Sequence, residues 1–121
     1  MTDEQLIQRI RETAILRGEF TLRSGRKSNY YIDKYLFEPQ PDILKALGER
    51  LAKYVDDSVD RLAGAELGWI PLVTATAMAT GKPCVLIRNQ KKDYGTAKQF
   101  EGALEAGERV LIVDDIATTG G

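Results

Sequence analysis

The chain contains no histidine and only one cysteine among its 121 residues. The absence of histidine excludes catalytic triads and metal sites that depend on imidazole. A single cysteine, Cys84, excludes an internal disulfide, and its place in the apolar run PCVLI predicts a buried structural thiol. A metal site in this chain therefore has to be built from carboxylates, which favour Mg²⁺ or Mn²⁺.

Long apolar runs and a strong charge of one sign are also missing. No apolar stretch approaches the ~18 residues of a membrane span, and the first residues, MTDEQL, lack the pattern of a signal peptide. The net charge of −1 gives no broad basic field for nucleic acid or an anionic membrane. These absences predict a cytoplasmic protein with no nucleic-acid or membrane partner, in which a local cluster of cations holds any bound anion.

The remaining composition, 43% hydrophobic and 29% charged, is typical of one globular domain over residues 1–121. Periodicity and turn residues predict alternating strands and helices, which implies an α/β fold with a parallel core sheet and a small N-terminal antiparallel piece. The predicted elements are a helix from Thr2 or Asp3 to Arg17 stopped by Gly18, extended segments at EFTL and YYIDKYLF, a helix capped by Asp42, a buried strand RLAGA, a helix PLVTATAMAT ended by Gly81, a strand PCVLIR and a buried strand RVLIV.

Three polar loops leave predicted strands: GAELG, NQKKDYGTAK and DDIATTGG. Ligands of parallel sheets bind outside the carboxyl ends of the strands, so we expect these loops to form one site. In the last loop, two carboxylates can bind Mg²⁺ or vicinal hydroxyls, and the TTGG that follows can form a backbone nest for phosphate. This order of groups suits a ribose 5-phosphate.

An apolar run followed by two aspartates also occurs in P-loop ATPases and receiver domains. The chain contains no GxxxxGK[ST], which argues against the first, and receiver domains need a long chain after the acidic pair. A solvated acidic turn is the remaining alternative for the two aspartates taken alone.

Two cationic segments are candidates for anion binding. The first is the basic loop, whose Gly-containing sequence can clamp a polyphosphate; the second places cations beside aromatic rings, which can hold a flat anionic ring. The alternatives are a solvated hairpin tip for the first, which is favoured when that loop is taken alone, and for the second an edge hairpin whose cations discourage strand pairing. The residues are Arg88, Lys91, Lys92, Tyr94 and Lys98 in the first segment, and Arg23, Arg26, Lys27, Tyr30 and Tyr31 in the second.

Taken together, these segments resemble the orotate phosphoribosyltransferases, which are type I phosphoribosyltransferases. VLIVDDIATTGG resembles that superfamily's PRPP-binding signature, and FTLRSGRKSNYYIDKYLFE, GAELGWIPL and IRNQKKDYGTAKQFEG resemble the orotate-specific members. The resemblance implies an N-terminal helix and hood over residues 1–40, a PRPP-binding core over 41–121, and transfer of ribose 5-phosphate from PRPP to orotate with release of pyrophosphate. It also implies Mg²⁺ as cofactor and a homodimer.

The resemblance implies a role for each matched residue. Lys92, Arg88, Asp114 and Asp115 are the expected catalytic residues, with Mg²⁺ held mainly by PRPP and also by the two aspartates, and Arg88 and Lys92 reaching the partner's site in trans. The loop carrying Lys91 to Lys98 is expected to close over PRPP and exclude water. PRPP contacts are expected from Arg23, Arg88, Lys91, Lys92, Tyr94, Asp114, Asp115, Ile116, Ala117, Thr118, Thr119, Gly120 and Gly121, and orotate contacts from Tyr31, Ile32 and Thr118.

The chain departs from the family pattern at four places, one of which is Ala97, where glycine is common. Asn89 stands where many members have a basic residue, and Gly68-Trp69 stands where relatives commonly have two glycines. Relatives also continue beyond the TTGG motif with a helix and further strands, so we expect the C-terminal part of the fold to be missing. We therefore expect this chain alone to fold poorly or to depend on its dimer partner, with little activity. The alternatives are a non-catalytic or regulatory PRPP-binding relative, and a phosphoribosyltransferase for another base.

Overall fold

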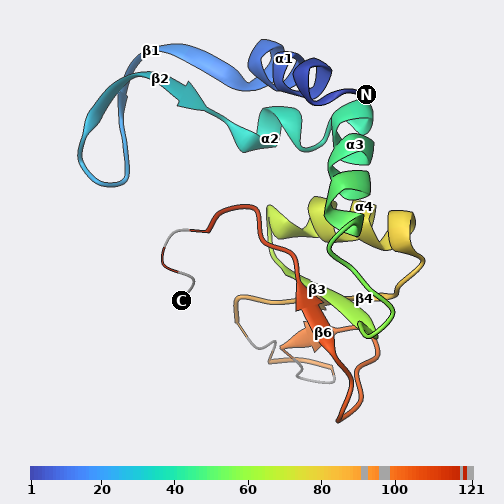
Figure 1. The fold of residues 1–121 in the computed structure, drawn as a ribbon. Coiled ribbons are helices and arrows are strands. Elements are labelled where there is room, and N and C mark those ends of the chain that lie inside the picture. Colours follow the sequence, from blue (N-terminus) through green and yellow to red (C-terminus); the bar gives the residue numbers. More distant parts are fainter. Residues whose placement is uncertain (91–92, 96–98, 118, 120–121) are drawn as a thin grey trace. The chain divides into compact units, whose positions relative to one another are not determined.

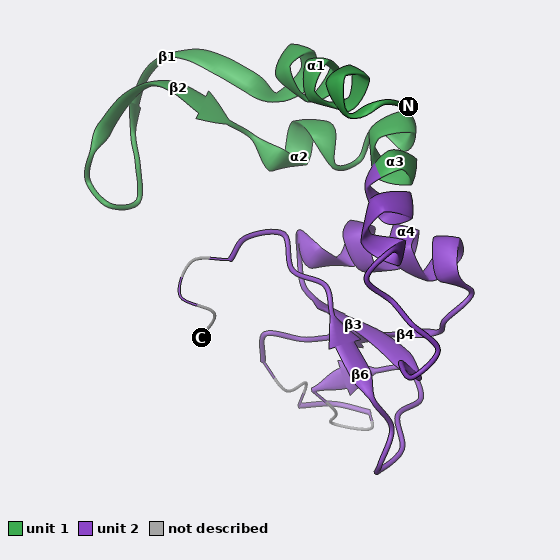
Figure 2. Ribbon diagram, in the orientation of Figure 1, with its two compact units in different colours: residues 1–46 green, residues 47–121 purple. Residues whose placement is uncertain are grey.

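The structure is a computed structural model of the chain, and it describes residues 1–90, 93–95, 99–117 and 119 (Figure 1). The chain forms two compact units, Met1–Ala46 and Leu47–Gly121 (Figure 2), and each is considered by itself. The elements in chain order are α1 (Asp3–Ala14), β1 (Ile15–Thr21), β2 (Lys27–Ile32), α2 (Lys34–Phe37), α3 (Pro41–Ala52), β3 (Arg61–Ala65), α4 (Trp69–Thr80), β4 (Cys84–Ile87), β5 (Phe100–Glu101) and β6 (Val110–Ile112).

In the N-terminal unit, helix α1 begins with a capping box. The Thr2 hydroxyl accepts a hydrogen bond from the Gln5 backbone N–H, and the Gln5 side chain accepts one from the Thr2 N–H. The helix is followed at once by the antiparallel hairpin β1–β2, in which Ile15 pairs with Ile32. The described apolar core of this unit is small and is formed by residues of α1 and α3: Leu6, Ala14, Ile43 and Ala46 are buried.

An ion pair joins α1 to the first turn of α3. The Arg9 guanidinium donates to both Asp42 carboxylate oxygens, from Nε at 2.7 Å and from Nη2 at 3.1 Å. This hydrogen-bonded pair raises the pKa of Arg9 and lowers the pKa of Asp42 from their ordinary values. Asp42 therefore contributes through tertiary pairing rather than as a helix cap.

In the C-terminal unit, a four-stranded sheet has the order β5-β4-β3-β6, with β3 parallel to both neighbours and β5 antiparallel to β4. Helix α4 packs on β3, where Gly64 allows a close approach: a Cβ there would lie 2.7 Å from Val73 Cγ1. Leu62, Val73 and Val85 are the buried centre of this layer. Figure 1 shows β3, β4 and β6 side by side, with α4 across one face.

These observations confirm the predicted α/β fold and its N-terminal antiparallel piece. RLAGA is β3 with the predicted bounds, and PLVTATAMAT lies in α4, which ends at Gly81 with a positive φ of 74°. The division at residue 40 remains a prediction, since the two compact units meet inside α3.

Five local predictions are wrong. The first helix ends at Ala14 rather than Arg17, because Ile15–Arg17 pair with β2, and Gly18 lies within β1. YYIDKYLF is not continuously extended, because Asp33 caps α2. Helix α3 begins at Pro41, so Asp42 is in its first turn. Strand β6 is not buried: the exposed fractions are 39% for Val110 and 61% for Ile112, since this strand pairs only with β3 among the described residues. Finally, Cys84 is half-buried rather than buried as predicted.

Candidate functional site

The loops that follow the three parallel strands emerge at one edge of the C-terminal sheet. Ala65, the last residue of β3, is in register with Ile87, the last residue of β4. Just past β6, the Val113 N–H donates to the Ala63 carbonyl at 2.9 Å. The predicted convergence of GAELG, the basic loop and DDIATTGG is therefore confirmed for the described parts of these loops.

The acidic pair begins directly after this strand end. Asp114 is exposed, and its Oδ1 accepts a hydrogen bond from the Ile116 N–H at 2.9 Å, which starts a turn. Asp115 is half-buried, while Ile116, Ala117 and Thr119 are exposed. The remaining predicted nest residues, Thr118, Gly120 and Gly121, lie outside the described residues.

The basic loop has a stem made by β4 and β5. At its base, the Arg88 N–H donates to the Gln99 carbonyl at 2.7 Å, and Arg88 Nε lies 3.3 Å from Glu101 Oε1 in a half-exposed ion pair. Tyr94 is 65% exposed. The predicted phosphate-binding residues Lys91 and Lys92, and Lys98 as well, lie outside the described residues.

Glu66, in the loop after β3, is a member of this site that the sequence analysis did not single out. Its Oε1 accepts a hydrogen bond from the Asn89 N–H at 2.7 Å, and its own N–H donates to the Ile87 carbonyl at 3.0 Å. The signal that could have suggested it was a charged residue inside a strand-end loop of otherwise small and apolar residues, GAELG.

The predicted orotate contacts belong to the N-terminal unit. Tyr31 and Ile32 lie at the end of β2 and are 45% and 49% exposed. The Tyr31 ring lies 5.7 Å from the Phe20 ring across the hairpin. Arg23 is exposed in the turn between β1 and β2, where Gly25 adopts a φ of +87°. The hairpin thus presents several exposed cations, among them Arg23, Arg26 and Lys27, and an aromatic side chain packed against Phe20.

The donor set fits a metal ion that is shared with a substrate. Within the described ranges, no three acidic or cysteine side chains come together as a metal cage. Asp114 and Asp115 supply two neighbouring carboxylates, and Mg²⁺ is commonly bound by one or two carboxylates together with substrate phosphates.

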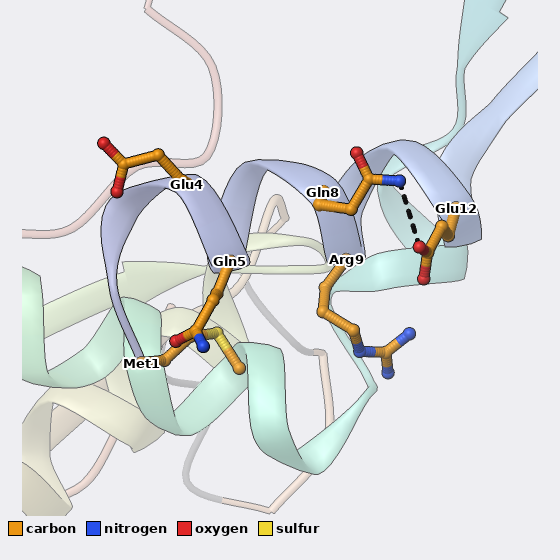
Figure 3. Close-up of a pocket in the computed structure, with 6 residues that line it drawn as sticks. All are labelled: Met1, Glu4, Gln5, Gln8, Arg9 and Glu12. Atoms are coloured by element: carbon orange, nitrogen blue, oxygen red, sulfur yellow. Dashed lines mark hydrogen bonds between the residues drawn. The ribbon is translucent and has the colours of Figure 1, made fainter.

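Two surface hollows lie away from these residues. One, of about 270 Å³, lies on the apolar face of the sheet beside Ala63, Val85 and Ile112. The other runs along α1, where Gln8 donates to Glu12 and Arg9 projects beside them (Figure 3). Neither includes a predicted site residue, so the site is recognised from its strand-end loops rather than from a cavity. In the described part of the chain, no helix is long and apolar enough to cross a membrane.

Comparisons with known proteins identify the family. No protein-family model matches the chain. The orotate phosphoribosyltransferase of Natronomonas pharaonis is 47% identical over 121 residues, which cover 99% of this chain and 69% of that protein. The orotate phosphoribosyltransferase of Methanocella arvoryzae is 44% identical over 118 residues, covering 97% of this chain and 67% of that protein.

A solved structure agrees with these relatives. The crystal structure of the Mycobacterium tuberculosis orotate phosphoribosyltransferase with Fe(III) dicitrate superposes with a TM-score of 0.79 at 30% identity, covering 96% of this chain and 68% of that one. The chain thus spans about two thirds of the length of the relatives it matches, 69% and 67% for the two named above. Fold, strand-end site and sequence agree, and the chain belongs to the orotate phosphoribosyltransferase family.

Proposed function

We propose that this chain carries binding and catalytic residues for the reaction of its family, the transfer of ribose 5-phosphate from PRPP to orotate. The products are orotidine 5′-monophosphate and pyrophosphate, which makes the chain a glycosyltransferase of pyrimidine synthesis. The observation that carries the proposal is the acidic pair, placed directly after β6 at the edge where the loops after β3 and β4 also emerge. The named relatives and their 44–47% identity supply the choice of orotate.

Asp114 and Asp115 hold the ribose of PRPP in this proposal. Carboxylates accept hydrogen bonds from vicinal hydroxyls, and the exposed Asp114 side chain leaves an oxygen available beside the turn that it begins. Backbone N–H groups that follow, from Ile116 to Gly121, surround the 5-phosphate as a nest. Thr118, in the same segment, also lies against orotate.

The cations of the basic loop stabilise the departing pyrophosphate. As the bond from the anomeric carbon to pyrophosphate breaks, positive charge develops on the ribose ring and negative charge on the leaving group. Arg88, Lys91 and Lys92 offset that negative charge, which is worth most in a site from which water is excluded. Tyr94 and Arg23 complete the proposed PRPP contacts.

Orotate is bound by the hairpin. The Tyr31 ring is already packed against Phe20, so it can cover a flat pyrimidine at low cost in side-chain entropy. Ile32 provides an adjacent apolar surface. This assignment predicts that changes in the hairpin alter orotate affinity more than PRPP affinity.

Mg²⁺ is the proposed cofactor, bound mainly by PRPP, with Asp114 and Asp115 as its protein ligands. When bound, it supplies Lewis-acid stabilisation of the pyrophosphate oxygens. The aspartates then have a second task, because the same carboxylates that orient the ribose hydroxyls also fix the position of the metal–PRPP complex. A cytoplasmic location is part of the same proposal and rests on the family assignment.

We further propose a homodimer in which Arg88 and Lys92 act in the partner's site. A complementation experiment tests this arrangement: Arg88→Ala and Asp115→Asn chains are each inactive alone and are then mixed. If the residues act in trans, each mixed dimer contains one site with both residues intact, and activity returns. Continued inactivity of proven mixed dimers would show that both residues act in the same chain.

The reaction itself is tested by incubating the purified chain with orotate, PRPP and Mg²⁺ and measuring pyrophosphate and orotidine 5′-monophosphate. Omission of orotate and replacement by adenine are the controls, and both should abolish product. Calorimetric binding of PRPP with Mg²⁺ but no orotate-dependent pyrophosphate release would instead support a non-catalytic PRPP-binding relative. Turnover with adenine but not orotate would reject the base assignment. Clear turnover by the purified chain would contradict the expectation that it has little activity alone.

A further inference from the structure

Glu66 makes an unusual connection at the site edge. The residue is exposed, yet its backbone is bound to the last residue of β4 and its carboxylate to the segment that follows β4. Its Oε1 accepts from the Asn89 N–H at 2.7 Å, and its N–H donates to the Ile87 carbonyl at 3.0 Å. Glu66, in the loop after β3, is therefore hydrogen-bonded to the residue before Arg88 and to the residue after it.

Arg88 is the residue enclosed by these contacts. Its N–H donates to the Gln99 carbonyl at 2.7 Å, and its guanidinium Nε lies 3.3 Å from Glu101. The Glu66 contacts fix the peptide groups before and after it, so the direction of the Arg88 side chain depends on Glu66 through the backbone. Asn89, with no basic side chain to offer phosphate, contributes its N–H to this connection.

The negative charge of Glu66 is unfavourable beside a polyphosphate site, which suggests that its hydrogen bond to the Asn89 N–H has a function. A carboxylate beside a polyphosphate site repels the ligand, and a glutamine could accept the same hydrogen bond without that cost. Removing the side chain altogether would leave the Asn89 N–H to water and free the turn that carries Arg88. The hydrogen-bonding role and the charge are therefore separable by substitution.

We propose that Glu66 is a positioning residue that sets the orientation of Arg88 toward the pyrophosphate group of PRPP by holding the Asn89 N–H. This inference rests on the proposed function. Glu66 does not touch the reacting atoms, so it acts on affinity for the pyrophosphate part of PRPP and on the rate of its departure through Arg88.

The experiment compares Glu66→Ala, Glu66→Gln and the unaltered chain by hydrogen exchange at the Asn89 amide and by calorimetry with PRPP and Mg²⁺. For Glu66→Ala we expect faster Asn89 exchange and about three- to tenfold weaker PRPP binding, the usual effect of one lost hydrogen bond. Glu66→Gln should keep the slow exchange and bind PRPP at least as tightly as the unaltered chain. In turnover assays, the Ala variant should lose kcat/KM for PRPP while KM for orotate stays unchanged.

Glu108→Ala is the matched control. Glu108 also accepts a backbone N–H, from Glu105 at 2.7 Å, and pairs with Arg61 at 3.1 Å, but it lies at the other end of the sheet from the site loops. This variant should lower the melting temperature without altering PRPP affinity. Slow Asn89 exchange in Glu66→Ala, or PRPP affinity unchanged from that of the unaltered chain, would overturn the inference. A Gln variant as weak as the Ala variant would also overturn it, by showing that the charge is what matters. If the unaltered chain binds no PRPP, the proposed function fails and this inference fails with it.

Discussion

The hairpin of the N-terminal unit and the strand-end loops of the C-terminal unit hold their functional groups in different ways. Along β2, most residues are exposed, and Tyr31 is ordered by one cross-strand partner, Phe20. The loops of the other unit extend from β3, whose three central residues are buried between α4 and the neighbouring strands. Binding groups on the hairpin can therefore change with little effect on folding, whereas those at the sheet edge depend on a packed core.

The largest expected effect comes from the acidic pair. Asp114→Asn and Asp115→Asn should each lower kcat/KM by roughly 100-fold or more, because the amide cannot replace a carboxylate toward ribose hydroxyls and Mg²⁺. Steady-state kinetics with varied PRPP measures the loss, with the exposed Asp57→Asn as control. An Asn variant with nearly full activity would remove these carboxylates from the proposed site.

The next prediction tests the packing between α3 and α4 in the C-terminal unit. Gly48, in the second half of α3, faces α4, and a Cβ there would lie 2.7 Å from the carbonyl carbon and oxygen of Ala75. Gly48→Ala should lower the free energy of unfolding by about 2 kcal/mol, the usual cost of overpacking, as measured by urea unfolding.

The matched glycine substitution is in the hairpin turn. A Cβ at Gly25 has no atom within 4 Å, although the residue adopts a φ of +87°. Gly25→Ala should cost about 1 kcal/mol through backbone strain alone. If Gly25→Ala were more destabilising than Gly48→Ala, the proposed contrast between a core-supported region and a locally supported hairpin would be wrong.

A third prediction concerns orotate. Tyr31→Ala should raise KM for orotate about three- to tenfold, the value of one aromatic contact, with KM for PRPP unchanged. Tyr30→Ala is the control, because neighbouring residues of a strand point to opposite faces. Equal effects of the two substitutions, or a change in KM for PRPP alone, would argue against the assignment of Tyr31 to the base.

The same contrast explains which predictions from the sequence succeeded. RLAGA was predicted correctly because a short apolar run between polar segments is typical of a buried parallel strand, and its bounds follow from that run alone. The convergence of the loops after β3, β4 and β6 also followed, since parallel strands end at a common edge. These features depend on local composition and on a general rule of sheet topology.

The failures involve pairing between distant segments. The residues after Ala14 fit a helical pattern, but Ile15 pairs with Ile32, and this tertiary contact decides in favour of a strand. The apolar sequence of β6 predicts burial without revealing how many neighbours the strand has. The role of Glu66 depends on a contact with Asn89, 23 residues away, which no local pattern specifies.

The smallest expected effect is on the pH dependence of stability, through the Arg9–Asp42 pair. Because the folded-state pKa of Asp42 is lowered, its contribution to stability is present above the unfolded pKa of about 4 and is lost as the pH falls through the folded value. Asp42→Asn should therefore slightly lower the melting temperature at neutral pH and flatten its decline below about pH 4.

Both groups are partly exposed, so the effect should be modest and should shrink in high salt. Glu49→Gln, on the next turns of α3, provides a carboxylate control of the same helix. A decline below pH 4 that is as steep in Asp42→Asn as in the unaltered chain would show that this pair does not contribute to acid stability. In that case the N-terminal unit would owe its stability to the small core around Leu6 and Ile43, and the contrast with the strand-rich unit would be one of core size rather than of the kind of contact.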